Sequence, residues 1–216
     1  MEKTNSVLLV EGKDEVDVIT KLYQSFNLKQ VFQIDDCKGK DELKKGISVR
    51  IKGSEFNKIG ILLDADTDMH ASWESMYNLL RKNNFTLING EVIPKLMPKD
   101  GLISTNNEKI IGVWIMPNNE LEGMLEDFIR FLIPTDDKLL PIAEEIIAKI
   151  EHEKLNKYPP THHAKALIHT WLAWQKKTGS PFGQAITANY LDVKNTELCS
   201  VFMNWIHKLF VETELS

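Results

Sequence analysis

The sequence has few cysteines and no long apolar run, and these two absences exclude whole classes of protein. Its 216 residues include only Cys37 and Cys199, which lie far apart and lack the CxxC spacing of a zinc knuckle. A disulfide scaffold is therefore excluded, and a reducing compartment is favoured. No stretch approaches the ~20 apolar residues of a membrane span, and the apolar run after Met1–Asn5 is too short for a secretion signal. We therefore expect a soluble, cytoplasmic protein with no membrane partner.

An excess of positive charge and glycine-rich nucleotide motifs are also absent. Lys and Arg number 26 against 31 Asp and Glu, which gives a net charge of −5. The chain thus lacks the overall basic field of a dedicated nucleic-acid binder, and any phosphate contact must be local. Neither Gly12-Lys13 nor Gly39-Lys40 belongs to a GxxxxGK[ST] loop, and no GxGxxG occurs, so P-loop and dinucleotide sites are excluded.

Short apolar runs that alternate with segments of helical periodicity are present in the first half of the chain. Strands are expected at 7–10, 31–34 and 59–63, and helices at 14–26, at 41–51 and around 73–83. Residues 35–40 read as a turn. The strand–helix alternation predicts right-handed crossovers and a mostly parallel, Rossmann-like sheet with flanking helices.

The pattern changes after residue 85, and the last third of the chain reads as helical. We expect an edge strand at 92–97, a central strand at 110–116, and a helix at 119–133 that Pro134 ends. Further helices are expected at 138–153, 162–177, 182–191 and 196–211. We therefore divide the chain into an α/β domain, residues 1–133, and an all-helical extension packed on it, residues 134–216.

Acidic residues follow two of the predicted strands at their carboxyl ends. Glu11 and Glu15 come after the first strand, and Asp64, Asp66 and Asp68 after the third. Ligands of open α/β sheets bind at this edge, so these acids are expected to converge. Clustered carboxylates repel one another unless a cation compensates them, and Mg²⁺ or Mn²⁺ suits oxygen ligands.

The spacing of these acids suggests how they would divide between ions. Asp64 and Asp66 lie on one side of an extended tip because side chains alternate, so with Glu11 they can hold one ion. Glu15 and Asp68 are able to serve a second ion. Each has an alternative, because Asp68, like Asp14, is a preferred helix N-cap, and Glu15 also suits a solvated first helical turn.

Two segments resemble the paired signatures of the Toprim domain. They are Val-Leu-Leu-Val-Glu-Gly-Lys-Asp at 7–14 and Ile-Leu-Leu-Asp-Ala-Asp at 61–66. Toprim domains are shared by topoisomerases, bacterial primases, RecR-type repair proteins and overcoming-lysogenization-defect (OLD) nucleases. The resemblance covers about residues 5–133. It implies that Glu11 acts as general acid or base and that Asp64 and Asp66 bind Mg²⁺, while Glu15 matches an additional acid of the two-metal OLD nucleases.

The segment Trp-Ile-Met-Pro-Asn-Asn at 114–119 and the helical tail are similar to those of small bacterial and archaeal Toprim-related proteins. The chain lacks the additional domains of primases and topoisomerases, so the resemblance does not imply synthesis or strand passage. A role in DNA repair or defence is what it suggests.

Several basic residues are candidates for contact with a phosphate backbone. We assign Lys13 and Lys40 to this role, together with Lys165 and His169, which fall near one face of the helix expected at 162–177. The alternative for that helix is a solvated polar face opposite a core face. The same helix carries Trp171 and Trp174, which with Trp205 are expected in the core.

Two further acids follow the strand at 110–116. Glu120 or Glu122 would support the metal ligands or serve a second metal. The alternative is a capping pair, in which Asn119 begins the next helix and Glu122 stands three residues later.

These observations predict divalent-metal-dependent phosphodiester chemistry on nucleic acid, as a nuclease that uses Mg²⁺ or Mn²⁺. One alternative is a non-catalytic Toprim scaffold that binds metal, nucleic acid or a protein partner. Another is an enzyme that acts on a nucleotide or another small phosphorylated ligand, because a fold does not determine a function.

Overall fold

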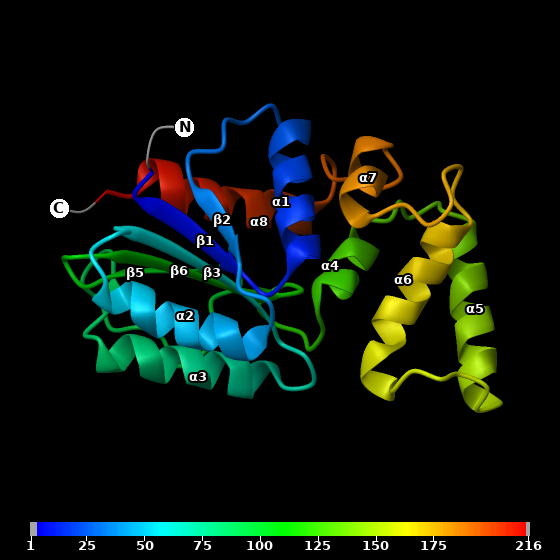
Figure 1. Cartoon of the computed structure of the whole chain (residues 1–216), viewed down its shortest axis with the longest axis horizontal. Coiled ribbons are helices and arrows are strands. Elements are labelled where there is room, and N and C mark those ends of the chain that lie inside the picture. Colours follow the sequence, from blue (N-terminus) through cyan, green and yellow to red (C-terminus); the bar gives the residue numbers. More distant parts are fainter. Residues whose placement is uncertain (1–3, 215–216) are drawn as a thin grey trace.

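One six-stranded sheet organises the computed structural model, which describes residues 4–214 (Figure 1). The strands are β1 Ser6–Val10, β2 Gln33–Asp36, β3 Lys58–Asp64, β4 Thr86–Leu87, β5 Leu102–Thr105 and β6 Ile110–Met116. Their order is β2-β1-β3-β6-β5-β4. The first four strands run parallel to one another, β5 pairs antiparallel with β6, and β4 pairs antiparallel with β5. The predicted α/β class with a mostly parallel sheet is therefore confirmed.

Helices cover both faces of the sheet because its central strands are apolar on both sides. In β1, Val7 and Leu9 belong to one buried cluster and Leu8 and Val10 to the other. Helices α2 Lys40–Lys52 and α3 Met69–Lys82 pack on the first face. Helices α1 Lys13–Ser25 and α8 Glu197–His207 pack on the second (Figure 1).

The remaining C-terminal elements extend from the carboxyl edge of the sheet. They are α4 Leu125–Phe131, α5 Leu139–His152, η1 Pro160–His162, α6 His163–Ala173 and α7 Phe182–Thr187. The π-helical turn η2 Lys208–Glu212, which follows α8, packs instead on β3 and β6. Figure 1 shows α5 and α6 side by side at a distance from the strands, with α4 between them and the sheet. Helix α7 packs on α1. None of the described helices has the length and apolar character needed to cross a membrane.

The helical region shares its core with the sheet. Residues of β1, β6, α1, α4, α6, α7 and α8 belong to one continuous apolar cluster. The predicted division at residue 133 is therefore not a break in the packing, although it is the place where regular α/β alternation ends. Trp171 and Trp205 lie in this cluster as predicted, but Trp174 is 38% exposed, because α6 ends at Ala173 and Trp174 follows its last turn.

Two predicted elements differ from the structure for identifiable reasons. Residues 92–97 form no strand, because Pro94 and Pro98 cannot donate to a ladder, and Val92 and Leu96 are exposed instead. The helix predicted at 119–133 begins only at Leu125. Smaller boundary shifts place Asp35 and Asp36 in β2 rather than in a turn, and shorten α6 and α7 relative to 162–177 and 182–191.

Candidate functional site

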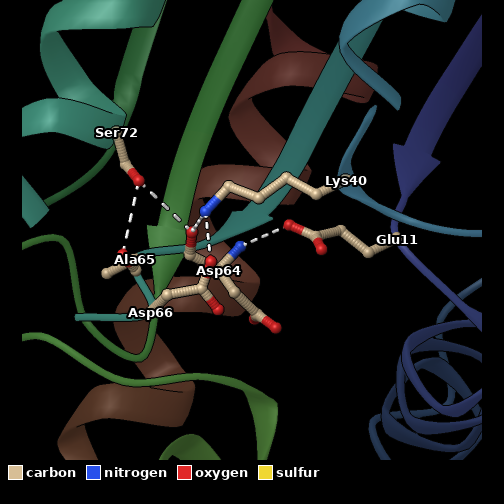
Figure 2. Close-up of polar contacts among 6 residues, drawn as sticks. All are labelled: Glu11, Lys40, Asp64, Ala65, Asp66 and Ser72. Carbon is tan, nitrogen blue, oxygen red and sulfur yellow. Dashed lines mark hydrogen bonds and ion pairs between the residues drawn. The ribbon is translucent and has the colours of Figure 1, made fainter. Parts of the chain in front are cut away.

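Glu11 and Asp64 meet at the carboxyl ends of two neighbouring parallel strands. Glu11 follows β1, and Asp64 is the last residue of β3, which pairs with β1. The Glu11 Oε1 accepts a hydrogen bond from the Asp64 backbone N–H at 2.9 Å, as Figure 2 shows. The structure thus brings together Glu11 and Asp64, which were expected to converge because both follow parallel strands at the carboxyl edge of the sheet.

Glu15 joins this pair from the first turn of α1. Its side chain is only 8% exposed, and its Oε2 accepts a hydrogen bond from the Gly12 backbone N–H at 3.0 Å. Gly12, not Asp14, is the N-cap of α1. Glu15 is therefore not a solvated first-turn acid, and Asp14 does not have the capping role considered as an alternative.

A pocket of about 540 Å³ opens between this edge of the sheet and the helical region. Its acidic lining residues are Glu11, Asp14, Glu15, Asp64 and Glu126. Glu126, on α4, is 5% exposed and was not singled out from the sequence. The signal that could have found it is topological, because α4 follows β6, whose carboxyl end lies beside that of β3.

Burial and mutual repulsion raise the pKa values of three acids in the pocket. Burial raises the pKa of Glu11, and burial with the nearby charge of Glu11 raises the pKa of Glu15 to about 7. The pKa of Asp64 is raised well above its ordinary value, first by burial and then by the negative charges of Glu11 and Glu15. Carboxylates in this situation retain protons unless a cation joins them.

Asp66 lies at the tip of β3 in a left-handed conformation. Its φ is 55°, and it exchanges two backbone hydrogen bonds with Gly123, at 2.9 and 2.8 Å. This conformation differs from the extended Asp64–Asp66 tip expected from the sequence, and Asp66 is outside the pocket lining. The pairing also holds residue 123 at φ 135°, which explains why the helix predicted from residue 119 begins later.

Lys40 contacts both aspartates of this tip from the start of α2 (Figure 2). Its Nζ lies 2.5 Å from the Asp66 Oδ2 and donates to the Asp64 carbonyl oxygen at 2.9 Å. The ammonium group therefore compensates Asp66 but reaches only the backbone of Asp64. Lys40, which we assigned to substrate contact, is an internal partner of the acids in this structure.

The other predicted acids lie outside the pocket. Asp68 is the N-cap of α3, and its Oδ1 accepts from the Ala71 backbone N–H at 2.8 Å, which is the alternative considered for it. Glu120 is exposed and pairs with Lys99 at 2.7 Å, and Glu122 is also exposed. The alternative capping role of Asn119 is not adopted either, because its buried side chain accepts from the Ile115 backbone N–H.

The predicted basic residues are divided between the pocket and the surface. Lys13 and Lys165 line the pocket, together with His162, and the Lys165 Nζ lies 3.7 Å from the Glu126 Oε1. His169 does not line it, and its ring stacks on Phe182 with centroids 5.4 Å apart.

The oxygen-rich lining suits a hard divalent cation, but the side chains are turned toward other partners. Across residues 4–214, no group of three or more His, Cys, Asp or Glu side chains is placed to hold an ion. The reason lies in the contacts above, because Glu11 and Glu15 accept backbone hydrogen bonds and Asp66 holds Lys40. An ion that uses these carboxylates would require their side chains to rotate.

Comparison with known proteins places the chain in a family. The family described as "Protein of unknown function (DUF3226)" matches residues 5–211. The chain belongs to this family. No curated protein and no solved structure matches it. The DUF3226 match includes both the sheet and the helical region, so the acids of the pocket and its rim on α6 lie within one family unit.

Proposed function

We propose that the protein catalyses divalent-metal-dependent hydrolysis of phosphodiester bonds in nucleic acid at the acidic pocket. The observation that carries this proposal is the convergence of Glu11, Glu15, Asp64 and Glu126, from three separate segments, on one pocket. Their crowding is unfavourable without a cation, as the raised pKa of Asp64 indicates. Mg²⁺ or Mn²⁺, held by Glu11 and Asp64 with Glu15 or Glu126, would relieve it.

The residues around the pocket suit this chemistry. A bound divalent ion would polarise the phosphate and lower the pKa of a water molecule. Glu11, which lies beside Asp64 at the carboxyl edge of the sheet and which the Toprim resemblance implies as general acid or base, is the group we assign to proton transfer. Lys13 and Lys165 at the rim would offset the charge of a phosphate group.

The Toprim resemblance of residues 7–14 and 61–66 supports the same assignment. It implies that Asp66 is a metal ligand together with Asp64. In that arrangement the divalent ion takes the place that the Lys40 ammonium holds at the Asp66 carboxylate, and Lys40 becomes available for a substrate phosphate.

A cleavage screen tests this function. Purified protein is incubated with single- and double-stranded DNA and RNA in Mg²⁺, Mn²⁺ or Ca²⁺. Cleavage is expected with Mg²⁺ or Mn²⁺, and Glu11→Gln and Asp64→Asn should each lower the rate by at least about 100-fold. Glu74→Gln, an exposed acid on α3, is the matched control. Cleavage that persists at the same rate in Asp64→Asn would contradict the proposal.

A non-catalytic scaffold is the second candidate, and the Lys40–Asp66 ion pair favours it. In a scaffold, Lys40 would be a permanent structural partner of the tip rather than a group that an ion displaces. This candidate predicts no metal-dependent cleavage by the wild type, with binding of nucleic acid or a protein that survives Glu11→Gln.

A further inference from the structure

One long segment of this acidic protein contains no acidic residue. No Asp or Glu occurs from Lys154 to Leu191, although the whole chain carries 31 of them and a net charge of −5. The segment, which we call the cationic segment, contains five lysines and three histidines: Lys154, Lys157, Lys165, Lys176, Lys177, His162, His163 and His169. Its positive charge is therefore not neutralised within its own sequence.

All eight of these basic side chains are exposed. Two have an acidic partner, because His163 lies 2.9 Å from Glu151 and Lys165 lies 3.7 Å from Glu126. Within residues 4–214, no carboxylate lies within 4.0 Å of the ammonium group of Lys157, Lys176 or Lys177. These lysines are thus available to a ligand that comes from solution.

The cationic segment leads to the acidic pocket. It includes α6, which Figure 1 shows standing away from the sheet beside α5. Its residues His162 and Lys165 form part of the pocket lining. The cationic segment and the acids Glu11 and Asp64 thus line one continuous pocket through His162 and Lys165.

An exposed aromatic ring lies on the same segment. Trp174 is 38% exposed at the C-cap of α6, two residues before Lys176. A solvent-accessible indole beside lysines is the combination that single-stranded nucleic acid uses, because an unpaired base can stack on the ring while its phosphates meet the cations. Duplex bases are already stacked on each other and gain nothing from it.

We propose that the cationic segment binds the backbone of a single-stranded nucleic acid, with a base stacked on Trp174, and guides the strand into the acidic pocket. This inference rests on the proposed function for its ligand class. It adds that the ligand carries several phosphates, since the lysines span the segment from Lys157 to Lys177 and a mononucleotide would engage only the pocket.

Binding of a labelled oligonucleotide in EDTA tests the surface without any chemistry. Fluorescence anisotropy is followed with oligodeoxyuridylate and oligouridylate of about 20 nucleotides, which carry the same base, in separate arms that identify the preferred sugar. The triple variant Lys157→Gln, Lys176→Gln, Lys177→Gln should bind at least about tenfold more weakly at low salt. The slope of log K against log salt should fall in magnitude by about 2, because three phosphate contacts are lost.

Matched variants show whether binding depends on the cationic segment or only on the total charge of the protein. Lys29→Gln, Lys52→Gln, Lys82→Gln removes the same charge from exposed positions away from the cationic segment and should leave binding unchanged. Trp174→Ala should weaken binding about tenfold, and Trp174→Phe should restore most of the loss, because a ring is retained. Equal losses in the two triple variants would overturn the proposal.

Other outcomes are equally decisive. Equal affinity for a duplex with the same number of phosphates would overturn the single-strand assignment, and equal affinity for polyglutamate would point to an acidic protein partner. Absence of binding at low salt would also overturn it. Oligonucleotide binding without cleavage would refute the proposed catalysis alone, whereas metal-dependent hydrolysis of a small phosphodiester without oligonucleotide binding would refute this surface alone.

Discussion

Among single residues, Asp64 is a buried carboxylate that lies close to several other acids. Its pKa is raised well above the ordinary value by burial and by the charges of Glu11, Glu15, Asp66 and Glu126. Lys40 does not relieve it, because its ammonium group donates to the Asp64 carbonyl rather than to the carboxylate. A divalent cation at this position would therefore interact strongly with the folded state.

The first prediction is that Mn²⁺ or Mg²⁺ stabilises the folded protein and that Asp64→Asn abolishes the effect. A ligand that binds only the native state raises the melting temperature, because it shifts the unfolding equilibrium by mass action. The measurement is thermal unfolding across millimolar metal. Asp68→Asn is the control, because Asn also caps α3 and the ion effect should persist. An unchanged wild-type melting temperature would argue against an ion site.

The second prediction concerns Glu15, whose pKa is raised from 4.5 to about 7 by burial. The folded protein therefore binds this proton more tightly than the unfolded chain, so stability should fall as pH rises from about 4.5 through 7. Glu15→Gln keeps an acceptor for the Gly12 N–H and cannot ionise. Above pH 7, the free energy of unfolding of Glu15→Gln should therefore exceed that of the wild type by up to about 3 kcal/mol.

Urea denaturation in EDTA at pH 5, 6, 7 and 8 measures this difference. The unfolding free energies of the wild type and Glu15→Gln should be closest at pH 5 and diverge as pH rises. Glu74→Gln, which changes an exposed acid, should follow the wild-type curve. Parallel curves for the wild type and Glu15→Gln would show that Glu15 titrates at its ordinary pKa.

At the scale of elements, two glycines allow the C-terminal helices to pack directly on the sheet. Gly60 of β3 and Gly112 of β6 are paired neighbours in the sheet. A Cβ at Gly112 would lie 2.5 Å from the Leu209 Cδ2, and one at Gly60 would lie 2.9 Å from the Phe210 ring. The absence of side chains there is what lets η2 approach the strands.

The third prediction is that Gly112→Ala destabilises the protein by about 1–3 kcal/mol, because the added methyl group overpacks against Leu209. Leu209→Ala alone should lower the free energy of unfolding by about 2–5 kcal/mol, because it leaves a cavity in the core. Combined, the two changes should cost less than the sum of the single effects, since the smaller side chain admits the methyl group. Chemical denaturation of all four proteins measures this cycle. Strict additivity would show that the two residues do not contact.

At the scale of the whole molecule, the helical region completes the core rather than forming a separate one. Trp114 of β6 packs against Phe202 and Trp205 of α8, with ring centroids 5.1 and 5.7 Å apart. All three side chains are fully or almost fully buried. The sheet face covered by α8 would therefore be an apolar surface without it.

The fourth prediction is that a fragment ending at residue 133 fails to fold cooperatively and aggregates. Removing residues 134–216 takes away α5 to α8 and exposes Trp114 and Phe128 to water. Size-exclusion chromatography and thermal unfolding of the fragment, compared with the full chain, measure the outcome. A soluble fragment with a sharp unfolding transition would establish residues 1–133 as an independent domain.

The sequence by itself determined the parallel core and the position of Glu11 and Asp64. Apolar runs of strand length followed by helical periodicity predict parallel strands, and parallel strands place their carboxyl ends at one edge. The burial of Trp171 and Trp205 followed from the same periodicity. These features depend on spacing along the chain, which the sequence states directly.

Only the tertiary structure decided which partners the site residues adopt. The pairing of Asp66 with Gly123 delays α4 and brings Glu126 into the pocket, while Lys40 reaches Asp66 from α2. Trp174 became exposed because α6 ends at Ala173, and Val92 and Leu96 became exposed because their segment joins no strand of the sheet. Local patterns encode periodicity, whereas hydrogen bonds and ion pairs between distant segments depend on how the whole chain packs.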